Sequence, residues 1–353
     1  MALRCIRNGV VRRVLRRTKG RGHDGEDLPR FLFSWATSTV PDGDRISLDG
    51  SRASAEMGRC VAVVIVSFGV LGCAIARQVS DVRVIVPFTP AHGLVFIELD
   101  SAGHGALLAL LDTGANASAI DPRRAAKLPI IEASTVEGTT GNLKVDVVMV
   151  EGLRVGKHRF PPLRATRRDL SGLLAPPGRS VDMILGSDAV SNRAVTIDFP
   201  ASRIELAARP PPDSSQGVPM ILDAGIPAIE GCIGGMDIWL RIDTGASFFE
   251  TPDVYINLPK RTWEGLRGAH AGIATSTHLK GTGANGVSVD LPVARIPIAS
   301  VGPLELDYVF VIAQPERGYF ANPDAKGFVS NNFLRQIGRV TLDYVNGRLR
   351  RSN

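Results

Sequence analysis

The chain carries the tetrapeptide Asp-Thr-Gly-Ala twice, at residues 112–115 and again at residues 243–246. Each copy follows a largely apolar run, residues 106–111 in the first case and residues 238–242 in the second. An aspartate that ends such a run and enters a Thr-Gly turn is predicted to lie where a strand ends, at the mouth of a sheet. A single Asp-Thr-Gly is an ordinary turn, but two copies in the same context indicate paired carboxylates.

Two carboxyl groups a few ångströms apart do not both ionise readily, so they share one proton. One acid then acts as a base toward a water molecule, while the other donates its proton to a substrate carbonyl. The repeated motif therefore predicts amide hydrolysis without a covalent intermediate, with Asp112 and Asp243 as the two acids.

The similarity between the two halves of the chain extends beyond the tetrapeptides. After its motif, each half has an apolar pair followed by a small residue, a short helical turn, a Val-Thr-Ile/Leu-Asp-aromatic strand and a last strand. In the first half these segments are residues 182–190, 194–199 and 203–206, and in the second half residues 327–334, 339–344 and 347–349. A duplicated β lobe explains this order, so we predict an all-β fold with two similar lobes around a central cleft.

These residues carry a family resemblance. The chain resembles the retropepsin-like aspartic proteases of the bacterial type, with two lobes in one chain as in pepsin-like enzymes. The resemblance covers residues 94–206 and 218–350, and rests on both tetrapeptides and on Ile184-Leu185-Gly186 with its counterpart Phe328-Val329-Ser330. It implies β-barrel lobes, an aspartic endopeptidase activity on a polypeptide substrate, and neither a cofactor nor a metal.

The resemblance also implies roles for single residues. Asp112 and Asp243 would form the catalytic dyad. The hydroxyls of Thr113 and Thr244 would brace the two loops against each other, and Gly114 and Gly245 would let the backbone approach the carboxylates. A threonine hydroxyl and a glycine backbone are suited to these tasks on physical grounds.

Two features depart from the pattern of the family. Ala115 and Ala246 lack the hydroxyl that pepsin-like enzymes place there as a donor to the carboxylate. Losing a donor to the charged form raises the apparent pKa values of the dyad, so we expect a mildly acidic optimum. Ser330 stands where a glycine is expected, which affects the packing beneath Asp243.

The remaining segments of the two halves are interpreted as follows. Residues 74–209 form the N-terminal lobe, residues 210–217 a Pro-rich linker, and residues 218–353 the C-terminal lobe. Glycine-rich turns at residues 137–142 and 280–286 predict hairpins that are candidate flaps over the cleft. The basic stretch from Arg164 to Arg179 is interpreted as a solvated loop, with an effect on substrate preference as the alternative.

Other chemistries find little support in the sequence. The histidines show no metal-ligand spacing, and there is no Gly-x-Ser-x-Gly elbow. The formal net charge is +6, but residues 1–56 hold 11 Lys and Arg against 7 Asp and Glu, whereas the chain from Ala74 holds 29 against 28. The basic residues do not alternate with aromatic ones, so we expect no nucleic-acid partner.

The amino terminus is predicted to direct export. Residues 1–56 indicate an unstructured leader or a misplaced translation start, with the true start at Met57. Residues 57–73 resemble a signal segment of a bacterial lipoprotein, in which Cys73 would be lipidated; an uncleaved anchor, plain secretion and a buried segment are the alternatives. We expect a periplasmic, membrane-attached monomer. Loss of the leader and lipidation of Cys73 would leave Cys232 without an intrachain disulfide.

Two alternatives to the hydrolase remain open at this stage. The first is a catalytically silent peptide-binding protein of the same fold. The second is a domain-swapped dimer, in which the lobes pair between chains instead of within one.

Overall fold

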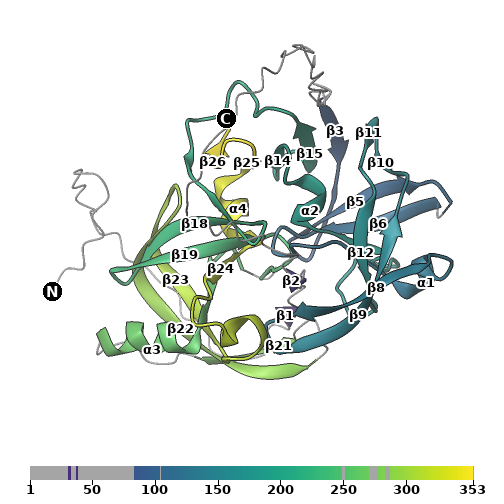
Figure 1. The fold of residues 1–353 in the computed structure, drawn as a ribbon. Helices are drawn as coiled ribbons and strands as arrows, with labels where there is room; N and C mark the ends of the chain where they lie inside the picture. Colours follow the sequence, from purple (N-terminus) through teal and green to yellow (C-terminus); the bar gives the residue numbers. More distant parts are fainter. Residues whose placement is uncertain are drawn as a thin grey trace, which may run out of the picture.

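The computed structural model of the protein describes residues 31–32, 37–38, 83–103, 105–248, 251–269, 277–282 and 287–352. The expected signal segment at residues 57–73, with Cys73, and most of the second candidate flap turn lie outside these residues. The described chain consists mainly of β-strands arranged in two lobes (Figure 1), which confirms the all-β fold class.

The first half of the chain forms an eleven-stranded sheet. In spatial order its strands are β11 (His158–Arg159), β10 (Leu153–Val155), β5 (Leu94–Ser101), β6 (Gly105–Leu111), β13 (Met183–Leu185), β7 (Ala119–Ile120), β12 (Leu163–Arg167), β9 (Asn142–Val150), β8 (Ile130–Glu137) and β2 (Thr37–Ser38), with β4 (Thr89–Ala91) paired to β5. Strands β6 and β13 run parallel at the centre of this sheet.

The second half forms a nine-stranded sheet. Its order is β1 (Phe31–Leu32), β21 (Thr277–Thr282), β22 (Ser288–Val301), β23 (Leu304–Gln314), β20 (Tyr255–Pro259), β24 (Gly327–Ser330), β19 (Met236–Asp243), β18 (Ile226–Ile233) and β17 (Ile221–Asp223). Strands β19 and β24 run parallel, as β6 and β13 do in the first lobe. The internal repeat seen in the sequence therefore corresponds to a repeat of the strand arrangement.

A six-stranded sheet joins the two halves. Its order is β16 (Val218–Pro219), β26 (Arg348–Arg351), β25 (Arg339–Asp343), β14 (Ala194–Asp198), β15 (Arg203–Ala207) and β3 (Val84–Pro87). The repeated Val-Thr-Ile/Leu-Asp strands, β14 and β25, pair antiparallel at its centre. The hydroxyls of Thr196 and Thr341 meet there at 2.7 Å. The linker at residues 210–217 leads into this sheet at β16.

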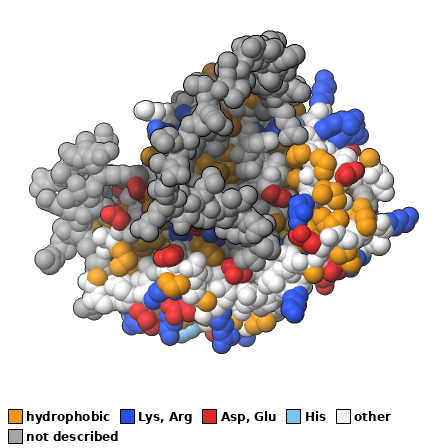
Figure 2. All heavy atoms as spheres, viewed as in Figure 1, with side chains coloured by type: hydrophobic (Ala, Val, Ile, Leu, Met, Phe, Trp, Pro, Cys, Tyr) orange, Lys and Arg blue, Asp and Glu red, His pale blue; other side chains and the backbone are white. Residues whose placement is uncertain are grey.

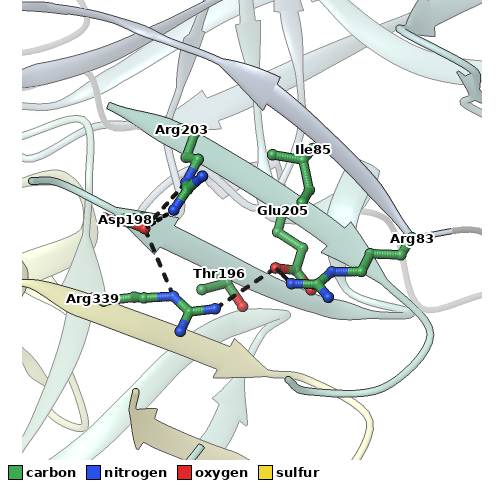
Figure 3. A pocket seen from close by; sticks show the side chains of 7 residues that line it. All are labelled: Arg83, Ile85, Thr196, Asp198, Arg203, Glu205 and Arg339. Carbon is green, nitrogen blue, oxygen red and sulfur yellow. Dashed lines mark hydrogen bonds and ion pairs between the residues drawn. The ribbon is translucent and has the colours of Figure 1, made fainter. Parts of the chain in front are cut away.

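An ion-pair cluster lies on the six-stranded sheet around a cavity of about 80 Å³ (Figure 3). Arg83 pairs with Glu205 at 2.6 Å, and Arg203 pairs with Asp198 at 3.2 Å. Arg339 of the second half reaches both acids, at 3.8 and 3.9 Å. Because Arg339 belongs to β25 of the second half and both acids belong to β14 and β15 of the first, the cluster links the two lobes at the sheet that they share.

The strands that lead to the two motifs are buried at their carboxyl ends. Residues 107–111 of β6 and residues 240–243 of β19 are all buried. A strand in the middle of a sheet that is covered on both faces has a continuous apolar sequence instead of an alternating one. This explains the apolar runs before the motifs. The predicted strands at residues 145–150 and 308–312 are confirmed within β9 and β23.

Helices are few and short among the residues that the structure describes. They are α1 (Pro122–Ala125), α2 (Ser187–Val190), α3 (Lys260–Ala269), α4 (Asn331–Ile337) and the 3-10 helix η1 (Gly318–Ala321). Helices α2 and α4 follow β13 and β24, in equivalent places of the two lobes. Helix α3 buries Trp263 and Leu266 against its sheet and exposes its charged face.

Two short strands lie inside the leader, where the sequence predicts no structure. Strand β1 pairs parallel with β21, and β2 pairs antiparallel with β8 (Figure 1). The edge of a sheet presents unpaired N–H and C=O groups, which accept a further strand from any extended segment of suitable position. The two strands thus extend the sheets of both lobes at their outer edges.

Three further observations concern Cys232, the helices and the surface. Cys232 is disulfide-bonded. The expectation that it has no intrachain disulfide concerns the chain after loss of the leader and lipidation of Cys73, and stays a prediction. Within the described part of the chain, no helix combines the length and the apolar character needed to cross a membrane. On the face shown in Figure 2, acidic and basic side chains are interspersed around the margin of the described surface.

Candidate active site

The two motif aspartates lie where central strands of the two lobes end. Asp112 follows β6, and its backbone N–H donates to the Leu185 carbonyl of β13 at 3.0 Å. Asp243 is the last residue of β19, opposite Ser330 of β24. Both aspartates are completely buried. The parallel neighbours β13 and β24 therefore hold the two acids at equivalent places in the two lobes.

The threonines of the motifs connect the two loops reciprocally. The Thr113 hydroxyl donates to the Ile242 carbonyl at 2.7 Å, and the Thr244 hydroxyl donates to the Leu111 carbonyl at 2.7 Å. Each hydroxyl oxygen also accepts the backbone N–H of the opposite threonine, at 3.2 Å for Thr113 and 2.9 Å for Thr244. Four buried hydrogen bonds between the halves fix the loops relative to each other.

The glycines of the motifs lie against the opposite carboxylates. A Cβ atom added to Gly114 would be 2.7 Å from Asp243 Cγ, and one added to Gly245 would be 2.4 Å from Asp112 Cγ. Both distances are too short for any side chain. Glycine is therefore required at these positions because the backbone of each loop touches the acid of the other lobe.

The two carboxyl groups are bound differently by the backbone. Asp112 Oδ1 accepts the N–H groups of Gly114 and Ala115, at 2.9 and 3.2 Å. Asp243 Oδ1 accepts the N–H of Gly245 at 2.8 Å. The Asp243 carboxyl is within hydrogen-bonding reach of the Asp112 carboxyl. Its buried Oδ2 has no donor among the described residues, so a proton shared between the acids would satisfy it.

The protonation of the dyad follows from these surroundings. Burial raises the pKa of Asp243 well above its ordinary value, and the charge of Asp112 and a hydrogen bond to Asp112 raise it further. The backbone N–H groups of Gly245 and Ala246 oppose this effect. Asp243 therefore keeps a proton at a pH where an ordinary carboxyl group has lost it.

The elements after β13 and β24 support the loops of the two motifs. The Ser187 N–H donates to the Ala115 carbonyl at 2.8 Å, and the Asn331 N–H donates to the Ala246 carbonyl at 2.8 Å. A Cβ atom on Gly186 would be 2.9 Å from that same Ala115 carbonyl oxygen. The second lobe accommodates Ser330 at the equivalent position, completely buried, with no partner for its hydroxyl in the described chain.

Ser330→Ala should raise the free energy of unfolding by about 1 kcal/mol, because it removes a buried hydroxyl that makes no hydrogen bond. Ser118→Ala is the matched control: the Ser118 hydroxyl donates to Asp188 at 2.8 Å and accepts the Gly186 N–H at 3.1 Å, so its loss should destabilise the protein. Urea unfolding of both variants measures the difference. A lower stability of Ser330→Ala would show that the hydroxyl has a partner.

Both predicted flap turns belong to hairpins. Strands β8 and β9 pair antiparallel around residues 138–141, and β21 and β22 pair antiparallel around the second turn. The first turn lies against the other lobe, since the Tyr319 N–H donates to the Gly138 carbonyl at 3.1 Å. Thr139 and Thr140 at its tip are buried. The hairpin of the first lobe thus reaches across to η1 of the second.

Two groups near Asp112 were not predicted from the sequence. Arg168 is buried. Burial lowers its pKa to about 10, and the charge of Asp112 opposes this lowering. The Tyr344 hydroxyl is buried as well, and burial together with the Asp112 charge raises its pKa. The interpretation of residues 164–179 as a solvated loop is wrong for its first part, because residues up to Arg167 form β12 and Arg168 is enclosed. A double arginine gives no local signal of which member is buried.

Comparison with known proteins bears on this geometry. Residues 97–189 match a family model described as aspartyl protease. The matched segment contains the first motif and Ile184-Leu185-Gly186, whereas the second motif lies beyond it. No curated protein matches the chain. The match supports an aspartyl protease at the level of the family.

In the described part of the chain, no group of three or more His, Cys, Asp or Glu residues is arranged to hold a metal ion.

Proposed function

We propose that the protein is an aspartic endopeptidase that hydrolyses peptide bonds with a water molecule activated between Asp112 and Asp243. The observation that carries this proposal is the pair of buried carboxyl groups within hydrogen-bonding reach, held by reciprocal threonine bonds between the lobes. The aspartyl protease match of residues 97–189 supports the same chemistry.

The proposed reaction uses the unequal protonation of the dyad. Asp112, as the base, takes a proton from the water as its oxygen attacks the carbonyl carbon. Asp243 donates its proton to the carbonyl oxygen, which gives a tetrahedral diol. When the C–N bond breaks, the nitrogen takes the proton now on Asp112, and a diol hydroxyl returns a proton to Asp243. The products are a carboxylic acid and an amine, and the dyad regains its starting state.

The hairpins support an extended polypeptide as the substrate. The chain's own residues 37–38 pair with β8, and residues 31–32 pair with β21. Both edges therefore bind extended backbone through main-chain hydrogen bonds, the mode in which a peptide is added to a sheet. Because main-chain groups make these hydrogen bonds, a substrate would be recognised by its extended backbone conformation as well as by its side chains.

A proteolysis assay on an unfolded protein substrate, scanned from about pH 3 to pH 8, tests the proposed activity. The raised pKa of Asp243 predicts cleavage at mildly acidic pH. Absence of cleavage at every pH, with a folded protein that still binds peptide, would favour the catalytically silent alternative. Solution mass distinguishes the proposed monomer from a swapped dimer of lobes.

Export is proposed from the sequence of residues 57–73. In this proposal the mature protein begins at Cys73, carries a lipid there and faces the periplasm as a membrane-attached monomer. Intact mass of the protein isolated from cells, in which residues 1–72 would be absent, measures both the first mature residue and the lipid.

Gly318→Ala should weaken the contact between the β8–β9 hairpin of the first lobe and η1 of the second. Gly318 has a φ of +50°, and a Cβ atom there would be 2.0 Å from the Gly138 carbonyl oxygen. We expect kcat/KM to fall about 10- to 100-fold, since the hairpin must move away from the second lobe. Gly172→Ala is the control, because a Cβ at Gly172 meets nothing within 4 Å. Equal kinetics of both variants would contradict a role of this contact in catalysis.

A further inference from the structure

Arg241 is buried in the strand that carries the second motif. It belongs to β19, two residues before the motif aspartate, and only 3% of it is exposed. The equivalent position of the first lobe is Leu110 of β6, which pairs with Ile184 of β13 in an apolar cluster. Arg241 pairs in the same way with Phe328 of β24. Since an apolar side chain fills this place in the first lobe, packing alone does not account for the arginine in the second.

The guanidinium of Arg241 contacts one acid and two aromatic rings. Its Nε donates to Asp223 Oδ2 of β17 at 2.7 Å. Its Cζ lies 4.1 Å from the centre of the Tyr319 ring and 5.5 Å from that of Phe328. An aromatic face attracts a guanidinium, and more strongly where water is excluded. Because Nη1 has no hydrogen-bond acceptor in the described chain, this end of the side chain rests on the rings.

Tyr319 is a residue through which the second lobe contacts the hairpin of the first. It belongs to η1, and its N–H donates to the carbonyl of Gly138, in the turn between β8 and β9, at 3.1 Å. Its ring is enclosed by Arg241 on one face and by the edge-to-face contact with Phe328 at 5.2 Å, and its hydroxyl accepts the Lys326 N–H at 2.8 Å. Direct contacts therefore lead from β19, through the Tyr319 ring, to the hairpin of the opposite lobe.

We propose that Arg241 is a positioning residue for the β8–β9 hairpin: it holds the Tyr319 ring, and thereby the η1 backbone to which Gly138 binds. The inference rests on the proposed hydrolase function, in which this hairpin closes over the bound peptide. The strand that carries Asp243 then also anchors the segment that receives the hairpin of the other lobe.

Exchange of the Tyr319 amide hydrogen tests this proposal without turnover. Its N–H is bonded to the opposite lobe, so exchange with solvent requires that the hairpin leave η1. Arg241→Met removes the cation but keeps an unbranched apolar side chain, and Asp223 retains its ion pair with Lys326 at 3.2 Å. We expect the Tyr319 amide to exchange about 3- to 30-fold faster in this variant, the effect of losing one cation–π contact.

Arg267→Met is the matched control for this measurement. Arg267 Cζ lies 4.7 Å from the centre of the Trp263 ring in α3, so the variant loses a cation–π contact that does not involve η1. The Tyr319 amide should then exchange as in the wild type. Unchanged exchange in Arg241→Met, or an equal acceleration in both variants, would overturn the proposal.

Arg241→Lys replaces Arg241→Met if the methionine variant does not fold. Its ammonium keeps a positive charge beside Asp223 but lacks the planar group that stacks on the ring. The Tyr319 amide should again exchange faster than in the wild type, and unchanged exchange in a folded Arg241→Lys would count against the proposal in the same way.

A kinetic comparison separates a role through Tyr319 from other roles of Arg241. On an unfolded protein substrate, Arg241→Met should lower kcat/KM by about the factor by which it accelerates the exchange, since both depend on the closed hairpin. In a Tyr319→Leu background this loss should vanish because the ring is absent, whereas in a Tyr319→Phe background it should persist. Equal losses in all three backgrounds would overturn the proposal. So would a loss confined to substrates with acidic side chains, which would assign Arg241 to substrate recognition.

Failure of the proposed function would give a different result. If the wild type cleaves no substrate, the hydrolase proposal fails. Exchange of the Tyr319 amide still decides whether Arg241 holds the hairpin on η1, because that measurement needs no reaction.

Discussion

Asp112→Asn and Asp243→Asn should each lower kcat about 100- to 10,000-fold, the range expected when a general acid or base is lost. Asparagine has the shape of aspartate but neither takes nor gives the proton that the reaction moves. Each variant retains one carboxyl group, so the dyad loses the combination of one charged and one protonated acid at every pH. The measurement is kcat on an unfolded protein substrate across the pH range in which the wild type is active.

Stability distinguishes this loss of catalysis from a loss of folding. The pKa of Asp243 is raised in the folded protein, so the folded state binds its proton more tightly than the unfolded state. The stability from this proton is complete below about pH 4, the ordinary range of a carboxyl group, and is lost as the pH rises through the raised value. Asparagine does not ionise, so Asp243→Asn should have a Tm at least equal to that of the wild type at neutral pH.

A clear decrease in the Tm of Asp243→Asn at neutral pH would contradict the protonation assigned to the dyad. Retention of full activity by either asparagine variant would contradict the proposed mechanism altogether. The two outcomes are independent, because one concerns the electrostatics of the buried pair and the other its chemistry.

Gly245→Ala should abolish most of the activity through a steric effect alone. The added Cβ would lie 2.4 Å from Asp112 Cγ and 2.6 Å from both carboxylate oxygens, so either the loop or the acid must move. A misplacement of about 1 Å at a reacting group lowers the rate on the order of 100-fold, and overpacking of this kind destabilises a protein by about 1–3 kcal/mol. We expect both effects, measured by kcat/KM and by urea unfolding.

Gly268→Ala is the matched control for this substitution. Gly268 lies in α3, and a Cβ atom there meets nothing within 4 Å. Alanine is a better helix former than glycine, so Gly268→Ala should leave activity unchanged and leave stability equal or slightly higher. Equal activity of Gly245→Ala and Gly268→Ala would show that the second motif does not contact the carboxylate of the first during turnover.

The strands and the paired acids could be predicted because their signals are local and repeated. Apolar runs of five or six residues before each motif indicate buried central strands, and the two motifs stand at equivalent places in a duplicated pattern. Ser330 stands out as a departure for the same reason, since the repeat supplies the residue expected there. Such predictions need only the spacing of residues along the chain.

The contacts across the cleft could not be predicted in this way. The hydrogen bond from the Tyr319 N–H to the Gly138 carbonyl joins residues that are 181 positions apart, and no pattern near either residue indicates it. The pairing of residues 31–32 and 37–38 with the two hairpins is of the same kind. Backbone edges accept many extended segments, so the partner depends on which one the fold brings near.

Arg168 shows most directly which features the sequence determines and which the tertiary structure determines. The order of residues alone determined that two aspartates, each followed by threonine and glycine, end the central strands of two similar lobes. Only the tertiary structure decided which of two adjacent arginines turns inward, because that depends on how β12 pairs with β7 and β9. The charge state of a buried carboxyl group depends on the charges and dipoles within a few ångströms, and these come from segments far apart in the chain.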